Sequence, residues 1–158
     1  MPGGKVAFYT GIFPITKDEQ GLAVVMGHEI AHAVAKHGNE RMTQQMKAQG
    51  LGTVVGVAVS GSPQATQDIF SIAFGISGNL ALLKYSRNHE SEADKLGLVF
   101  MALAGYDPSA AIPFWERMAA LSSEKPPQFL STHPSDAERI AALQKIMAST
   151  IQNYYKKS

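Results

Sequence analysis

The sequence contains no cysteine, which excludes disulfide bonds and thiolate metal sites. Charged residues make up only 17% of the 158 residues and nearly balance, leaving a formal net charge of +1. The one basic pair is Lys156 and Lys157, so the composition gives no support to nucleic-acid binding. Any metal ion would have to be held by carboxylates and by the chain's five histidines.

Long hydrophobic runs are also missing. The apolar stretch 54–59 is too short to span a bilayer. The stretch 69–83 is about 15 residues long and is interrupted by polar residues, whereas a transmembrane helix needs roughly 20. We expect both stretches to be buried in the protein, with a membrane-facing surface as the alternative. A chain of this size with 45% hydrophobic residues predicts one compact domain, residues 1–158.

The amino-terminal segment carries the only β signal. Residues 5–9 are rich in β-formers, and Thr10 and Gly11 supply a turn before residues 12–13, which predicts a short strand or hairpin. Residues 1–4 lack both the basic region and the apolar run of a signal peptide. Because the chain opens almost directly at a strand, we expect it to be a fragment of a longer protein.

The rest of the sequence predicts helices. Thr16 and Glu19 have the spacing of a capping box, which predicts a helix from there to about His37. Asn39 is expected to cap a helix over 40–49. Further helices are predicted over 63–82, 86–104, 108–121 and from 135 toward 155. The expected fold class is therefore mainly α (α+β), with a small β element at the start.

A glycine-rich segment, residues 50–61, separates two of these predicted helices. The spacing of its glycines has a faint likeness to a dinucleotide-binding loop. No βαβ unit surrounds it, so we interpret the glycines as a site of helix packing or as a mobile loop.

A His-Glu-x-x-His pentad, residues 28–32, lies inside the first predicted helix. His28 and His32 are four residues apart, about 40° apart around the helix, so both imidazoles can reach one metal ion. Glu29 is placed to hold a water and take its proton. The pentad sits on the apolar stripe, where two imidazoles and a carboxylate without partners would be costly to bury. We therefore predict a metal site.

A third ligand has to come from elsewhere in the chain. His37 lies about 140° around the helix from His32 and is interpreted as a capping or surface histidine. Glu90 and Asp94 are four apart on a later helix and share a face. One could ligate the metal while the other accepts a hydrogen bond from a ligating imidazole. His89 stays a secondary candidate.

Four segments together resemble the CAAX-prenyl-protease and HtpX-like family of zinc metallopeptidases. The resemblance is closest to the soluble bacterial periplasmic members of the BepA and LoiP type. The matching segments occur in the family's order over nearly the whole chain, and they are residues 2–11, the pentad, residues 85–97 and residues 131–140.

This resemblance implies a zincin-like helical core with one zinc ion per chain. His28, His32 and Glu90 would be its ligands, Glu29 the catalytic glutamate, and Asp94 the group that orients a ligating histidine. These roles come from the family and not from the spacing alone.

The family also has a Thr-His-Pro loop, to which residues 131–134 correspond. The resemblance implies that His133 is a switch able to displace the catalytic water, or else a group that stabilises the oxyanion. A plain loop histidine is the alternative. Arg87 and Arg139 are weaker candidates, either pairing with site carboxylates or steadying the loop.

The predicted function is that of a zinc metalloendopeptidase acting on extended polypeptides, such as misfolded or envelope proteins. The strand over 5–9 could pair with such a substrate by β-augmentation. The resemblance implies a periplasmic or envelope location, with peripheral association to a membrane or an outer-membrane protein. The alternatives are a latent zinc-bound chaperone module closed by His133, and an interaction unit in which the pentad is incidental.

Overall fold

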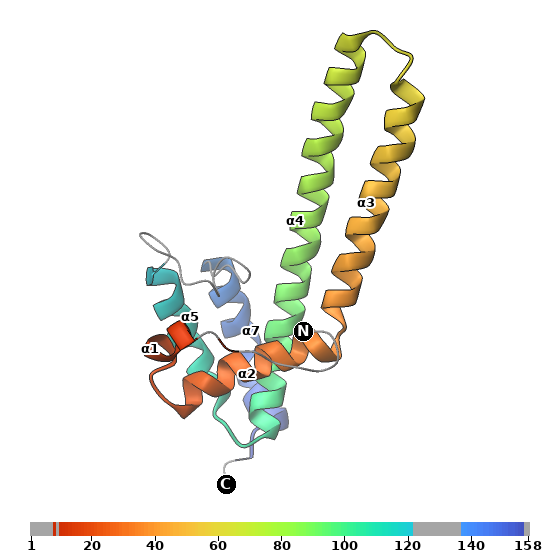
Figure 1. The fold of residues 1–158 in the computed structure, drawn as a ribbon. Helices are drawn as coiled ribbons and strands as arrows, with labels where there is room; N and C mark the ends of the chain where they lie inside the picture. Colours follow the sequence, from red (N-terminus) through yellow and green to blue (C-terminus); the bar gives the residue numbers. More distant parts are fainter. Residues whose placement is uncertain (1–7, 9, 122–136, 157–158) are drawn as a thin grey trace. The chain divides into compact units, whose positions relative to one another are not determined.

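A computed structural model describes residue 8, residues 10–121 and residues 137–156. The chain divides into two compact units, residues 1–35 with 90–158, and residues 36–89. Every regular element within the described residues is a helix (Figure 1). The expectation of a mainly α fold is therefore confirmed.

The β element expected at the amino terminus is not seen in the part of the chain that the structure describes. Thr10–Ile12 form a 3₁₀ helix, η2, and Phe13–Thr16 form the short helix α1. The predicted second arm of the hairpin is therefore wrong. A proline in the first turn of α1 favours this outcome because its fixed φ suits a helix start. The predicted strand over 5–9 lies outside the described residues, apart from Phe8.

Helix α2 (Glu19–Val34) has its cap two residues later than predicted. Its N-cap is Asp18, whose carboxylate accepts a hydrogen bond from the Gly21 amide at 2.8 Å. The Thr16 hydroxyl instead donates to the Phe13 carbonyl at 3.0 Å, at the end of α1. The prediction of Thr16 as the cap was wrong because a separate turn of helix already uses its side chain.

The remaining helices of this unit are the 3₁₀ helix η3 (Pro108–Ala110), α5 (Ala111–Ala120) and α7 (Ala137–Tyr154). As predicted, Asp107 caps the chain at this point, accepting from the Ser109 amide at 2.9 Å. The predicted helix over 108–121 is thus a 3₁₀ turn followed by α5. One buried cluster joins α1, α2, α5, α7 and the end of α4, and its largest members are Ile12, Leu98, Phe114, Trp115, Met118 and Leu143.

The second unit is a helical hairpin. It consists of α3 (His37–Val59) and the first part of α4 (Gln64–Leu103), joined by residues 60–63 (Figure 1). Helix α3 begins at His37 and continues through the glycine-rich segment, so the predicted start at Asn39 and end at Gln49 were wrong. Helix α4 is continuous where two helices were predicted.

The apolar stretch 54–59 is not buried. Val54 and Val57 are both exposed on α3, contrary to the sequence expectation, and Ile69 is exposed on α4. None of the helices in the described ranges combines the length and the hydropathy that a membrane crossing requires. The exposed side chains therefore need another explanation.

Candidate metal centre

Two glycines allow α2 and α4 to approach closely beside the pentad. A Cβ atom on Gly27 would lie 2.7 Å from the Gly97 carbonyl oxygen, and one on Gly97 would lie 3.0 Å from the His28 amide nitrogen. Glu90, Asp94 and Gly97 follow one another at i, i+4 and i+7 on one face of α4. The face that touches α2 therefore also presents two carboxylates to His28.

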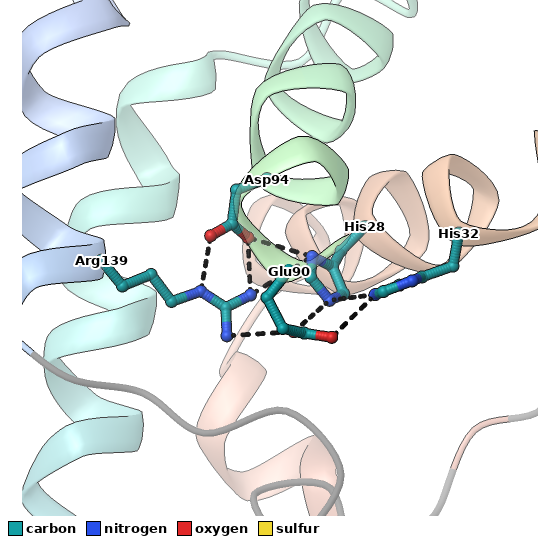
Figure 2. Close-up of polar contacts among 5 residues, drawn as sticks. All are labelled: His28, His32, Glu90, Asp94 and Arg139. Atoms are coloured by element: carbon teal, nitrogen blue, oxygen red, sulfur yellow. Dashed lines mark hydrogen bonds and ion pairs between the residues drawn. The ribbon is translucent and has the colours of Figure 1, made fainter. Parts of the chain in front are cut away.

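Three side chains with metal-ligating atoms converge at this crossing (Figure 2). The Nε2 atoms of His28 and His32 are 3.0 Å apart. Glu90 places Oε2 at 3.2 Å from the His28 Nε2 and Oε1 at 3.1 Å from the His32 Nε2. Ligand atoms around a tetrahedral zinc ion with bonds of about 2.05 Å are about 3.3 Å apart, close to these distances. Within the described residues, His28, His32 and Glu90 are the one group of this kind.

Asp94 contacts the other ring nitrogen of His28. Its Oδ1 lies 3.0 Å from the His28 Nδ1, and both side chains are buried. A proton on Nδ1 that is donated to this carboxylate leaves the lone pair of Nε2 directed toward Glu90 and His32. Glu90 therefore faces one ring nitrogen of His28, Nε2, and Asp94 contacts the other, Nδ1.

Arg139, from α7, binds Asp94 through two short contacts. Its Nε and Nη2 lie 2.6 Å from the two carboxylate oxygens, and Nη1 is 3.4 Å from the Glu90 Oε2 (Figure 2). The guanidinium carbon lies 3.5 Å above the ring of Trp115, in cation–π geometry. Nη2 is also 3.3 Å from the His28 Nδ1, a longer contact than that of Asp94. Arg139 therefore fixes the position of Asp94, which in turn contacts His28.

The charges of the site act on the pKa values of its buried members. Burial works to lower the pKa of His28, but the hydrogen bonds to Asp94 and Glu90 outweigh it and leave that pKa raised. Burial works to raise the pKa of Asp94, but His28 and Arg139 outweigh it and leave that pKa lowered. The raised pKa of His28 follows from two carboxylates that favour a positive charge there, and the lowered pKa of Asp94 follows from its contacts with His28 and Arg139. A proton supplies that charge in one state, and a bound cation would supply it in another.

The remaining predicted residues are placed as follows. Glu29 is half-buried on α2, about 60° around the helix from His32. His133 lies outside the described residues. His37 and His89 belong to the other unit, where their rings stack 4.1 Å apart and the His89 Nε2 lies 3.0 Å from a Glu40 oxygen. Neither histidine joins the ligand group. His37 is buried at the start of α3, so its interpretation as a surface histidine was wrong.

Arg87, the other arginine considered as a partner of the site carboxylates, is exposed in the second unit. Sequence reasoning did not single out Trp115 and gave Arg139 little weight. Trp115 is the only tryptophan of the chain, and its ring centre lies 5.7 Å from that of His28. Its position on the apolar side of α5 signals a core residue. The spacing of residues within α5 cannot predict that Trp115 contacts an arginine of a different helix.

A sequence profile of Peptidase family M48 matches residues 1–147. The chain belongs to this family. The family resemblance recognised in the four sequence segments is thereby confirmed.

The proteins similar to this M48 chain include mitochondrial and bacterial proteases. The mitochondrial metalloendopeptidase OMA1 of Schizosaccharomyces pombe is 39% identical over 147 residues, which cover 92% of this chain and 42% of the relative. OMA1 of Saccharomyces cerevisiae is 33% identical over 173 residues, 99% of this chain and 48% of the relative. The beta-barrel assembly-enhancing protease of Yersinia pestis is 34% identical over 151 residues, 88% of this chain and 30% of the relative.

The chain thus spans less than half the length of these curated relatives. No solved structure matches it.

Proposed function

We propose that this M48 chain is a zinc-dependent metalloendopeptidase whose catalytic domain is residues 1–158. The observation that carries the proposal is the convergence of two imidazole nitrogens and one carboxylate, with separations of 3.0 to 3.2 Å. Three protein ligands of this type are the donor set of a catalytic zinc site, which keeps one position for water or substrate. The proposed ligands of one zinc ion are His28, His32 and Glu90.

The chemistry divides between the ion and the side chains around it. Zinc held by His28, His32 and Glu90 would lower the pKa of a water and polarise a peptide carbonyl. Glu29 takes the proton of the attacking water and passes it to the leaving amine. Asp94 keeps the His28 Nδ1 protonated, so that Nε2 remains a ligand. His133 is proposed as a switch over the site or as a donor to the oxyanion.

The proposed substrates are extended polypeptides of misfolded or envelope proteins. Support comes from the relatives' names, which include a protease that enhances β-barrel assembly and a mitochondrial metalloendopeptidase. An envelope location, with peripheral association to a membrane or to an outer-membrane protein, is part of the same proposal.

Replacing the proposed base separates proteolysis from zinc binding. Glu29→Gln keeps the shape of the side chain but cannot take a proton, and general-base contributions are typically about 10²- to 10⁴-fold. We expect casein cleavage to fall by at least about 100-fold, while zinc content, measured by plasma mass spectrometry, stays near one ion per chain. Glu116→Gln, an exposed site on α5, is the matched control and is expected to cleave like the unaltered chain.

Three outcomes would contradict the proposal. Cleavage by Glu29→Gln at the unaltered rate removes Glu29 from the mechanism. Stoichiometric zinc without any cleavage by the unaltered chain favours a latent chaperone or assembly module. A chain that binds no zinc makes the pentad incidental and favours a structural interaction unit.

A further inference from the structure

The end of the α3–α4 hairpin exposes apolar side chains to solvent. Leu51, Val54 and Val57 on α3 and Ile69 on α4 are 61 to 69% exposed. The three residues of α3 follow one another at intervals of three, so their side chains are neighbours on the helix surface. We call residues 48–71 the hairpin tip. An exposed cluster of this kind marks a surface that another phase or molecule covers.

The apolar surface extends around a wide part of α3. Met46, also 66% exposed, lies about 140° around the helix from Leu51, and Val57 and Val54 fall between them. A partner helix covers only the narrower a/d stripe of a coiled-coil seam. A lipid phase contacts every outward direction at once. The breadth of the apolar arc therefore favours lipid over a second copy of the hairpin.

Three hydroxyl groups of the hairpin tip are bonded to backbone carbonyls close to them in sequence. Thr53, Ser60 and Ser71 each donate to a backbone carbonyl three or four residues earlier, at 2.8 to 3.0 Å. The side-chain amide of Gln67 donates to the carbonyls of Ser60 and Ser62 in the turn. These bonds persist without water, and so they reduce the cost of moving the hydroxyls and the turn into a hydrocarbon environment.

The hairpin tip carries few charges, and two basic side chains lie before it on α3. Residues 48–83 contain a single charged side chain, Asp68, whose carboxylate accepts a hydrogen bond from the Gln64 amide at 2.8 Å. Lys47 is exposed on α3 immediately before this segment, and Arg41, also exposed, lies six residues before Lys47. Basic side chains at the edge of an apolar segment are complementary to anionic headgroups.

The length of the neutral part of α3 fits one leaflet. Residues 48–59 are 12 residues, or about 18 Å at about 1.5 Å per residue. Half of a hydrocarbon core of about 30 Å is about 15 Å. The segment is therefore long enough to enter one leaflet.

We propose that the hairpin tip is a membrane-binding element that enters one leaflet of a bilayer rich in anionic lipid, with Arg41 and Lys47 at the headgroups. This inference gives a physical basis to the peripheral membrane association included in the proposed function. It does not depend on zinc or on proteolysis.

Vesicle flotation of the full chain tests the proposal. We expect flotation with vesicles of equimolar phosphatidylcholine and phosphatidylglycerol, and much weaker flotation with phosphatidylcholine alone. Val54→Gln combined with Val57→Gln should lower the apparent affinity at least about tenfold, because two apolar side chains are lost from the lipid contact. Leu103→Gln changes an equally exposed apolar residue in the other unit and should bind like the unaltered chain.

The absence of cysteine permits a second, site-specific readout. Val57→Cys carrying an environment-sensitive fluorophore should shift to the blue with the anionic vesicles and be quenched by brominated acyl chains. The same fluorophore at Leu103→Cys should show neither effect.

The proposal is overturned if the chain floats with neither type of vesicle, or if the two glutamines leave flotation unchanged. It is also overturned if the chain binds no vesicles but self-associates in solution in a way that the two glutamines abolish. That result would make a second copy the occupant. Flotation is measured without a substrate, so its failure leaves the protease proposal untouched, and a loss of cleavage would leave this one untouched.

Discussion

Arg139 is the residue through which the C-terminal helix acts on the proposed zinc ligands. Its two contacts of 2.6 Å fix both oxygens of Asp94, and the ring of Trp115 supports its planar face. A lysine keeps the charge but can neither form the forked pair nor stack in the same way. Groups that orient metal ligands typically contribute 10- to 100-fold to metal affinity.

We therefore expect Arg139→Lys to weaken zinc binding by about 10- to 100-fold, because Asp94 and hence the His28 ring lose their fixed orientation. Competition against a chelator of known affinity measures this directly. Arg117→Lys is the matched control, since Arg117 donates to the Ile15 carbonyl at 2.9 Å without touching the ligand group. Equal zinc affinities for the two variants would show that Arg139 has only a structural role.

The sequence predicted those parts of the candidate site that lie within one helix. Spacing of four residues paired His28 with His32 and Glu90 with Asp94, but left open which carboxylate faces the metal. The structure brings Glu90 to the Nε2 atoms and Asp94 to Nδ1. The contact of Arg139 with Asp94 joins residues 45 positions apart, and no periodicity within a helix reports such a pair.

At the scale of elements, the distance between α2 and α4 where they cross determines whether the carboxylates of α4 can contact His28 on α2. Gly27 and Gly97 let the two backbones meet, so the short side chain of Asp94 is sufficient to contact His28. A methyl group at residue 97 would lie 3.0 to 3.2 Å from backbone atoms of residues 27 and 28. Backbone atoms cannot rotate away as a flexible side chain can, so the helices would have to separate.

We expect Gly97→Ala to destabilise the chain by about 1 to 3 kcal/mol, the usual range for overpacking, and to weaken zinc binding as the carboxylates move away. Urea unfolding and chelator competition measure the two effects. Gly56→Ala is the matched control in the last turn of α3, where a Cβ would meet no described atom within 4 Å. It should be neutral or stabilising by up to about 1 kcal/mol. A Gly97→Ala chain as stable as the control contradicts the close-approach argument.

Element boundaries were the least predictable part of the fold. Glycines suggested a break in α3 after Gln49, yet a glycine costs a helix only about 1 kcal/mol, which the surrounding turns tolerate. The actual break before α3 falls at Lys36, which adopts a left-handed conformation with φ of 58°. Lysine gives no signal for that conformation, so the sequence predicted the boundary near His37, a few residues later than the structure has it.

For the whole molecule, the proposed site is a link between metal binding and folding stability. Glu90 and Asp94 are buried beside one arginine, so an added cation offsets an excess of negative charge. A ligand that binds only the folded chain stabilises it by about 4 kcal/mol at 1,000 times its dissociation constant.

We accordingly expect a chelator to lower the midpoint of thermal unfolding by several degrees, and added zinc to restore it. His32→Ala removes one proposed ligand and should unfold at the same temperature with and without zinc. Differential scanning fluorimetry at constant pH measures both chains. If neither chelator nor zinc changes the midpoint of thermal unfolding of the unaltered chain, the metal makes no contribution to folding stability.

The mainly α class followed from helical periodicity along the chain, and the structure confirms it. The division into two compact units did not follow, because it depends on contacts between segments far apart in sequence. Residues 36–89 separate the pentad from Glu90, and no local pattern shows that the chain returns to the first unit after them.

The single tryptophan gives the molecule an optical sensor of its own. Trp115 is buried, stacks under Arg139 and has its ring centre 5.7 Å from that of His28. Any change in the charge on that imidazole or in the position of the guanidinium alters the electric field at the indole. The intrinsic tryptophan emission of the unlabelled chain therefore comes from one indole, whose surroundings include the proposed metal site, with no second tryptophan to obscure the signal.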